Sequence, residues 1–395
     1  MPCFVQDCDY PGWASTGEEE QRPYLRYCAP AGSLHWASLR PLTFTMERLP
    51  YEIIHEFVSY LDSRSLLNLA LTSSHFNHAC LSEASRHLCV LNTLSALSGL
   101  THHIKQTTPL TRALTVYHGE WPKCDYKTWQ LHPLQVYEAH PFVSQSPSKR
   151  ENALQAFRHY RHFVAAEESR SRHGDIRRLN QILSSLPQLE QITISHACSH
   201  ARKPKKNAQL TRLCQQIWLF PGRRGSVDRL VGDFLTILPN YARIQDLKIE
   251  GVLRLESIGP LHAALRSVTR LDIRSLSMAN TTATTFNVFL SSFPALQNLH
   301  VNFSRCDPPT LIPLDRVPCP ELRSVSLANM YVGVLALVRF MQRHPALEVL
   351  QLDEPRLVDG RSVLCYPRDW LVSIDSRLTL RITSAAPDPG GVTSF

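Results

Sequence analysis

The sequence predicts an α/β protein in which a small module of three helices precedes a solenoid built from strand–helix units. Two regularities lead to this prediction. Apolar residues follow a helical spacing between Met46 and Cys80. Beyond residue 90, a strand-like pattern recurs and is preceded in most copies by an apolar, helix-like stretch.

Length and composition indicate a protein with a substantial core and no membrane anchor. The chain has 395 residues, of which 43% are hydrophobic and 19% are charged. We expect no transmembrane helix, because no apolar run reaches about eighteen residues. The N-terminus also lacks the basic and then apolar block of a secretory signal. We therefore expect an intracellular protein, in the cytoplasm and/or the nucleus, that does not act at a membrane.

The segment from Leu49 to Cys80 has the pattern of three short helices. Residues 62–65 interrupt the first helical pattern and can cap a second, very apolar helix over residues 66–71. Ser73 or Ser74 can cap the third. Apolar residues cover more of the first helix than a free-standing module needs, so this surface suits a protein partner. A helical hairpin that packs on the following domain explains the same periodicity equally well.

The residues of this segment resemble the F-box. The stretch LPYEIIHEFVSYLDSRSLLNLALTSSHFNHAC matches the F-box pattern without a gap over about a tenth of the chain. The matching positions are Leu49, Pro50, Glu52, Ile53, Ile54, Phe57, Val58, Leu61, Asp62, Leu66, Leu67, Leu69, Ala70 and Phe76. Ser74 and His75 stand where many F-box sequences have a basic residue before the aromatic one. This departure puts one contact at the edge of the expected adaptor-binding surface in doubt.

This resemblance implies a partner and a role. F-box proteins with repeat domains act as substrate receptors of Skp–cullin–F-box (SCF) ubiquitin ligases. The F-box binds the Skp-family adaptor and, through it, the cullin and RING subunits, while the repeats hold a protein substrate. The residues that the resemblance assigns to adaptor binding are Leu49, Pro50, Ile53, Ile54, Phe57, Leu61, Leu66 and Leu67. Some of these must instead pack the helices together, and the sequence does not sort them.

The strand-like pattern downstream is P-x-L-x-x-L-x-L. The clear copies are PQLEQITI from Pro187, ARIQDLKI from Ala242, SVTRLDI from Ser267, PALQNLHV from Pro294, PELRSVSL from Pro320 and PALEVLQL from Pro345. A degenerate copy begins at Pro109, and Leu378, Leu380 and Ile382 can close the series. The helix-like stretches are residues 179–186, 230–238, 261–265, 286–293 and 334–341.

A strand and a helix that recur every 24–28 residues are typical of a leucine-rich repeat, whose units must stack to bury their apolar faces. The copies lack the regular Asn or Cys after the strand, so we predict an irregular leucine-rich-repeat-like solenoid, of a type common in fungal F-box proteins. The alternative is an ordinary α/β domain with recurring strands.

The chain divides as follows in this interpretation. Residues 1–44 form a largely disordered lead-in, residues 45–90 the F-box, residues 91–384 the repeat domain and residues 385–395 a flexible tail. Insertions are expected near 120–173, helical at 151–168, and near 196–228.

Non-apolar positions of the predicted strands alternate with the buried ones and project from the other face of the sheet. On this concave face the target-binding candidates are Lys248, Arg270, Asp272, Asn298, His300, Arg323 and Gln351. The alternative for each is an ordinary solvated strand residue.

No pattern predicts catalysis, a cofactor or a metal. The chain lacks a phosphate-binding glycine loop, a G-x-S-x-G elbow and an H-E-x-x-H pair, so we expect it not to be an enzyme. Cysteine and histidine gather in two places, but neither set has zinc-finger spacing. They are Cys3, Cys8, Cys28 and His35, and His196, Cys198 and His200.

The net charge of +8 is modest for this length. Its densest cluster consists of Arg202, Lys203, Lys205 and Lys206, with Arg223 and Arg224 further on. We interpret it as a solvated loop, because no aromatic residues interleave with the charges as nucleic-acid binding would favour. Two other functions stay open, an F-box scaffold outside a ligase and a nucleic-acid-associated repeat protein.

Overall fold

The structure is a computed structural model. It describes residues 49–61, 63–107, 110–136, 147–197, 208–222, 226–259, 261, 263–279, 282–304, 311–312, 314–359, 362–364 and 379–383. The predicted lead-in and tail, the basic cluster and the zinc candidates other than His196 lie outside these residues.

Three helices open the described chain, as predicted. They are α1 (Tyr51–Ser59), α2 (Ser63–Ala70) and α3 (Ser74–Arg86). Ser73 caps α3, because its hydroxyl oxygen accepts a hydrogen bond from the backbone N–H of His75 at 3.2 Å. The small core between the helices consists of Ile54, Val58, Leu66, Phe76, Ala79 and Cys80.

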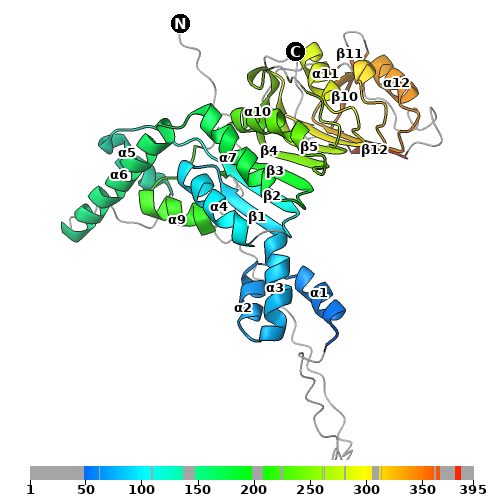
Figure 1. Ribbon diagram of the computed structural model, residues 1–395. Coiled ribbons are helices and arrows are strands. Elements are labelled where there is room, and N and C mark those ends of the chain that lie inside the picture. Colours follow the sequence, from blue (N-terminus) through cyan, green and yellow to red (C-terminus); the bar gives the residue numbers. More distant parts are fainter. Residues whose placement is uncertain are drawn as a thin grey trace, which may run out of the picture. The chain divides into compact units, whose positions relative to one another are not determined.

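In the described part of the chain beyond α3, nine parallel strands form one sheet (Figure 1). They are β1 (His87–Leu91), β2 (Ala113–His118), β3 (Gln191–His196), β4 (Asp246–Arg254), β5 (Arg270–Ser277), β6 (Asn298–Phe303), β7 (Ser324–Ala328), β9 (Val349–Asp353) and β12 (Thr379–Thr383). Their order in the sheet is their order in the chain. Each connection therefore adds a strand to the same growing edge, which is the topology of a solenoid and not of a sheet whose order reverses. The leucine-rich-repeat-like prediction is confirmed over the ordinary α/β alternative.

Helices in the strand connections cover one face of the sheet. They are α4 (Leu94–Thr107), α7 (Arg172–Ser184), α10 (Asp228–Ile237), α11 (Ala283–Ser291) and α12 (Val334–Arg343), with the 3-10 turns η3 (Leu238–Asn240), η4 (Leu255–Ser257) and η5 (Leu314–Arg316). The predicted helix at 261–265 is wrong, since the described residues there form turns and coil. The connection between β4 and β5 is short, and the helical turn among its described residues is η4.

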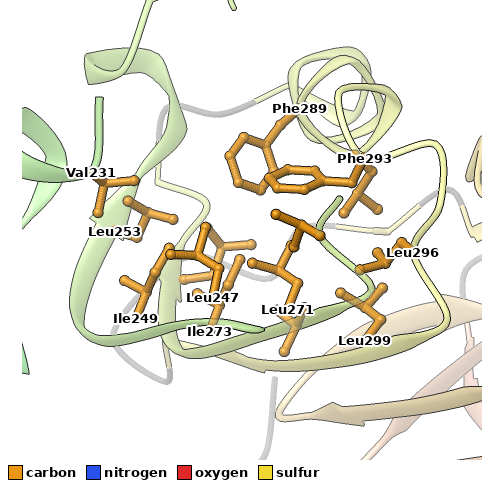
Figure 2. Close-up of a cluster of buried hydrophobic side chains, with 14 of the residues drawn as sticks. Val231, Leu247, Ile249, Leu253, Leu271, Ile273, Phe289, Phe293, Leu296 and Leu299 are labelled. Atoms are coloured by element: carbon orange, nitrogen blue, oxygen red, sulfur yellow. The ribbon is translucent and has the colours of Figure 1, made fainter. Parts of the chain in front are cut away.

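The main core lies between these helices and the apolar positions of the strands. Equivalent positions of neighbouring strands stack in rows, as with Leu247, Leu271 and Leu299. Figure 2 shows this row below the rings of Phe289 and Phe293, whose centroids lie 5.2 Å apart. Each such buried side chain contributes about 1.5–3 kcal/mol of transfer free energy. This stacking is what the L-x-x-L-x-L spacing predicted.

The two regions predicted as insertions contain α5 (Tyr126–Val136), α6 (Pro147–Glu168) and α9 (Ala208–Ile217). They share a separate aromatic core that includes Trp129 and Tyr160. The indole N–H of Trp129 donates to the carbonyl of Ile217 at 3.1 Å, so the two distant insertions are joined by a buried hydrogen bond.

A second, three-stranded sheet lies near the C-terminal end of the repeats. It consists of β8 (Tyr331–Gly333), β10 (Arg356–Asp359) and β11 (Ser362–Leu364) in the order β11-β10-β8. The guanidinium of Arg356 lies 5.2 Å from the ring centroid of Tyr331, a cation–π contact between β10 and β8.

Candidate protein-docking surfaces

Helix α1 has two apolar faces. Its inner face consists of Ile54 and Val58, which are buried in the three-helix core. Its outer face, the α1 stripe, consists of Pro50, Ile53, Phe57 and Tyr60, spaced three or four residues apart. Ile53 is 49% exposed and Tyr60 80% exposed. An exposed group of apolar side chains on one helix face is a candidate surface for contact with another protein.

Two further apolar side chains extend the exposed surface around the stripe. Tyr51 is exposed at the start of α1, and its hydroxyl lies 3.0 Å from Nδ1 of His78 on α3. Leu71 is exposed just after α2. The hydrogen bond between Tyr51 and His78 holds α1 against α3 and so fixes the direction of the stripe.

The uncovered face of the large sheet is polar. Its central row follows the strand register through Cys89, Thr115, Thr193, Lys248, Asp272, His300, Ser326, Gln351 and Arg381. Six of the seven predicted target-binding residues lie in this face within two adjacent rows. Four of them belong to the central row, and Arg270 and Asn298 pair with each other in the row directly beside Asp272 and His300. Gln351 continues the central row.

Charges on the central strands of this face neutralise one another. Glu250 lies 3.2 Å from Nζ of Lys248 and 3.4 Å from Nη1 of Arg274. Asp272 lies 3.8 Å from Nε of Arg274 and 3.9 Å from Nε2 of His300. The strands β4 and β5 therefore present alternating charges, whereas β6 and β7 present Asn, His and Ser side chains.

Arg323 is the predicted target-binding residue that departs from this arrangement. It precedes β7, and its side chain lies 4.0 Å from Glu348 on the strand connection. It is thus placed at the amino-terminal edge of the sheet rather than in the rows of the face.

The same face is covered at the β1–β3 end. Leu91 and Tyr117, which project from this side of the sheet, are buried together with Leu210 and Cys214 of α9. The insertion thereby restricts the uncovered part of the face to β4 and the strands that follow.

Residues 46–90 match the family model described as F-box-like. These residues are an F-box-like domain. The chain thus combines an F-box-like domain with a leucine-rich-repeat-like domain, although the last residues of the matched segment already belong to β1 of the sheet.

Similarity to solved structures and to curated proteins does not extend this assignment of the two domains. A structure of the leucine-rich repeat-containing protein LegL7 from Legionella pneumophila covers 70% of this chain and 85% of its own, with 14% identity and a TM-score of 0.22. The repeat architecture is accordingly established by the strand order of this chain itself. No curated protein matches the chain.

Side-chain exposure divides the residues of the F-box-like domain that were assigned to adaptor binding into an exposed group and a buried or partly buried group. Pro50, Ile53 and Phe57 are exposed in the α1 stripe. Ile54 and Leu66 are buried among the three helices, and Leu49 and Leu61 pack partly against that core. The side chain of Leu67 lies outside the described part of the chain.

Several exposed residues were not predicted. Tyr60 continues the helical spacing of Ile53 and Phe57 by one more turn. The spacing of apolar residues in the sequence was therefore sufficient to predict its position on the same face. Tyr51 and Leu71 lie beside the F-box pattern and not in it. On the sheet, Glu250 and Arg274 join the charged network because they lie two residues beyond Lys248 and Asp272.

Two other properties concern the described residues alone. No helix in this part of the chain is long and apolar enough to cross a membrane. Within the same residues, no group of three or more His, Cys, Asp or Glu side chains is placed to hold a metal ion.

Proposed function

We propose that the chain is the substrate-recognition subunit of an SCF-type ubiquitin ligase. Its F-box-like domain would bind a Skp-family adaptor, and its repeat domain would bind a protein target. The observation that supports this most strongly is the α1 stripe, an exposed apolar surface on the segment that matches the F-box-like model. Burial of this stripe against a partner removes apolar area from water, which stabilises a complex.

The chemistry in this proposal belongs to other subunits. The RING subunit and its conjugating enzyme transfer ubiquitin, and this chain raises the local concentration of the target's lysines beside them. A receptor of this kind needs no nucleophile of its own.

Target binding is assigned to the uncovered sheet face from β4 to β9. Its half-exposed side chains combine paired charges with the amides and hydroxyls of Asn298, Ser326 and Gln351. Such a face supplies many directional hydrogen bonds, which give specificity to a protein contact.

Affinity purification of the tagged full chain from cells tests the proposal. Wild type and Leu335→Asp should recover both the adaptor and cullin, whereas Ile53→Asp should lose both. Leu335 is a matched control, because it is a 61% exposed apolar residue on α12, outside the F-box-like domain. Recovery of the adaptor without cullin would indicate an F-box scaffold outside a ligase, and unchanged recovery with Ile53→Asp would contradict adaptor binding through the stripe.

A further inference from the structure

A polar cavity lies where β1 and β2 end, and none of its lining residues belongs to the α1 stripe or to the uncovered sheet face from β4 to β9. Its volume is about 320 Å³, near the lower limit of about 300 Å³ for small-molecule pockets. Asn92 directly follows β1, and His118 is the last residue of β2. The end of α6 and the side chains of Asp175 on α7 and Arg229 on α10 complete the wall.

A chain of hydrogen bonds runs along this wall. Asp175 accepts from Nε of Arg170 at 3.1 Å. Arg170 donates in turn to the backbone carbonyl of Asn92 at 2.9 Å and to its Oδ1 at 2.8 Å. The side chains of Arg170 and Asp175 are only 9% and 5% exposed. The guanidinium therefore fixes which end of the Asn92 amide is the oxygen.

This orientation determines the tautomer of His118. The Nδ2 group of Asn92 can only donate, and it lies 2.9 Å from Nδ1 of His118. Nδ1 must then be the acceptor, so the ring proton is on Nε2. Burial lowers the pKa of His118 to about 4, with further contributions from the neighbouring His196 and from the charges of Arg170 and Arg229. The ring is therefore neutral, and its Nε2 is a hydrogen-bond donor.

The carboxylates at the cavity already have cationic partners. Asp175 pairs with Arg170, Arg178 and Arg229. Glu167 accepts from Arg170 at 2.6 Å and from the backbone N–H of Leu94 at 2.7 Å. Glu168 lies 2.6 Å from Nζ of Lys123. Asp233, which also lines the cavity, accepts from Nε of Arg172 at 2.7 Å.

Arg229, by contrast, has more donor groups than its contact with Asp175 uses. Arg229 contacts Asp175 through Nη2 at 3.2 Å, and its side chain is 55% exposed. A guanidinium has five N–H groups, and we assign those that do not contact Asp175 to a ligand. A buried ion pair adds little net stability to a fold, because the cost of desolvating the two charges offsets their attraction. Holding α6, α7 and α10 together is therefore not by itself an explanation for the charged side chains around this cavity.

We propose that this cavity binds a small oxyanion, a free carboxylate or phosphate compound, held by the guanidinium of Arg229 and the Nε2–H of His118. A planar guanidinium and a neutral imidazole donor together match two oxygens of such a group. The site is separate from the α1 stripe, so the adaptor and the oxyanion would bind independently.

Calorimetric titration of the full chain with inorganic phosphate and with citrate, at constant ionic strength, tests the proposal. We expect saturable binding of at least one of them to wild type and to Arg339→Gln, which removes one exposed positive charge on α12. Arg229→Gln should weaken that binding at least tenfold. Arg229→Lys keeps the charge beside Asp175 and should bind with intermediate affinity, which separates ligand contact from loss of the ion pair. Binding of neither anion to wild type, or equal binding by Arg229→Gln, would overturn the proposal.

Discussion

The backbone of Gly251 lies against the side chain of Val227, at the point where β4 shifts register against β5. A Cβ atom at residue 251 would lie 2.4 Å from Cγ1 of Val227, closer than any real contact. Val227 is fully buried at the start of α10 and has little room to move. The absence of a side chain at residue 251 is therefore a packing requirement.

We predict that Gly251→Ala lowers the free energy of unfolding by about 1–3 kcal/mol, the usual cost of overpacking. Gly99 is the matched control, since it lies within α4 and a Cβ there would meet nothing within 4 Å. Gly99→Ala should stabilise the protein by up to about 1 kcal/mol through helix propensity. Urea denaturation measures both, and equal stabilities for the two variants would contradict this packing.

His118 makes stability depend on pH. Its pKa is lowered from 6.5 to about 4 in the folded chain. Between these two values the unfolded chain binds more protons, so stability is complete above about pH 6.5 and falls as the pH drops toward about 4. Burial lowers the pKa of His196 and His344 in the same direction.

We predict that His118→Gln loses less stability than wild type between about pH 6.5 and about pH 4, although it is less stable at neutral pH. Denaturation series across this pH range measure the two slopes. The variant retains the contribution of the other buried histidines, so its slope should be reduced and not abolished. Identical slopes would show that His118 is not held neutral by the fold.

At the scale of elements, α1 serves two surfaces at once. Ile53 and Ile54 are neighbours with the same side chain, yet Ile53 is exposed in the α1 stripe and Ile54 is 1% exposed in the core. A helix turns about 100° per residue, which places the two side chains on different faces.

This arrangement predicts that two equal truncations change the stability by very different amounts. Ile54→Ala should lower the stability of the F-box-like domain by about 2–5 kcal/mol through a buried cavity. Ile53→Ala should change it by less than about 0.5 kcal/mol, because its side chain is largely in water. Hydrogen exchange of the α1–α3 amides in the full chain compares the two, and similar loss of protection in both would contradict the assignment of faces.

The strands of the repeat domain were predictable, because the L-x-x-L-x-L spacing reports directly which side chains are buried. β1 was missed, since HLCVL follows α3 without that spacing and falls within the residues assigned to the F-box. The helix expected at 261–265 was wrong because apolar residues in a short connection pack without a regular helix. The sheet register and the cover that α9 provides depend on contacts between distant segments, which periodicity does not report.

The sequence led to a group of candidate adaptor-binding residues and did not sort them one by one. Both faces of α1 are apolar, so the sequence does not separate Ile53 from Ile54; only the packing of α2 and α3 does. The oxyanion cavity gave no sequence signal at all. Asn92, His118, Arg170 and Arg229 are scattered over the chain, and only the strand ends and helices bring them together.

At the scale of the whole molecule, the two docking surfaces differ in chemistry. The α1 stripe is apolar, so binding through it should resist added salt. The sheet face from β4 to β9 is polar with paired charges, so contacts there depend more on geometry and on ionic strength. A lasting contact with an adaptor and an exchangeable contact with a target fit this difference.

The affinity of the purified full chain for a Skp-family adaptor, measured by calorimetry, tests the central claim most directly. The double variant Ile53→Ala/Phe57→Ala should weaken binding by at least about tenfold, because central apolar side chains contribute most to such interfaces. The control Val288→Ala/Leu335→Ala removes two exposed apolar side chains from α11 and α12 and should leave the affinity within about twofold of wild type. Unchanged affinity in the folded Ile53→Ala/Phe57→Ala variant would contradict the assignment of the α1 stripe as the adaptor-binding surface.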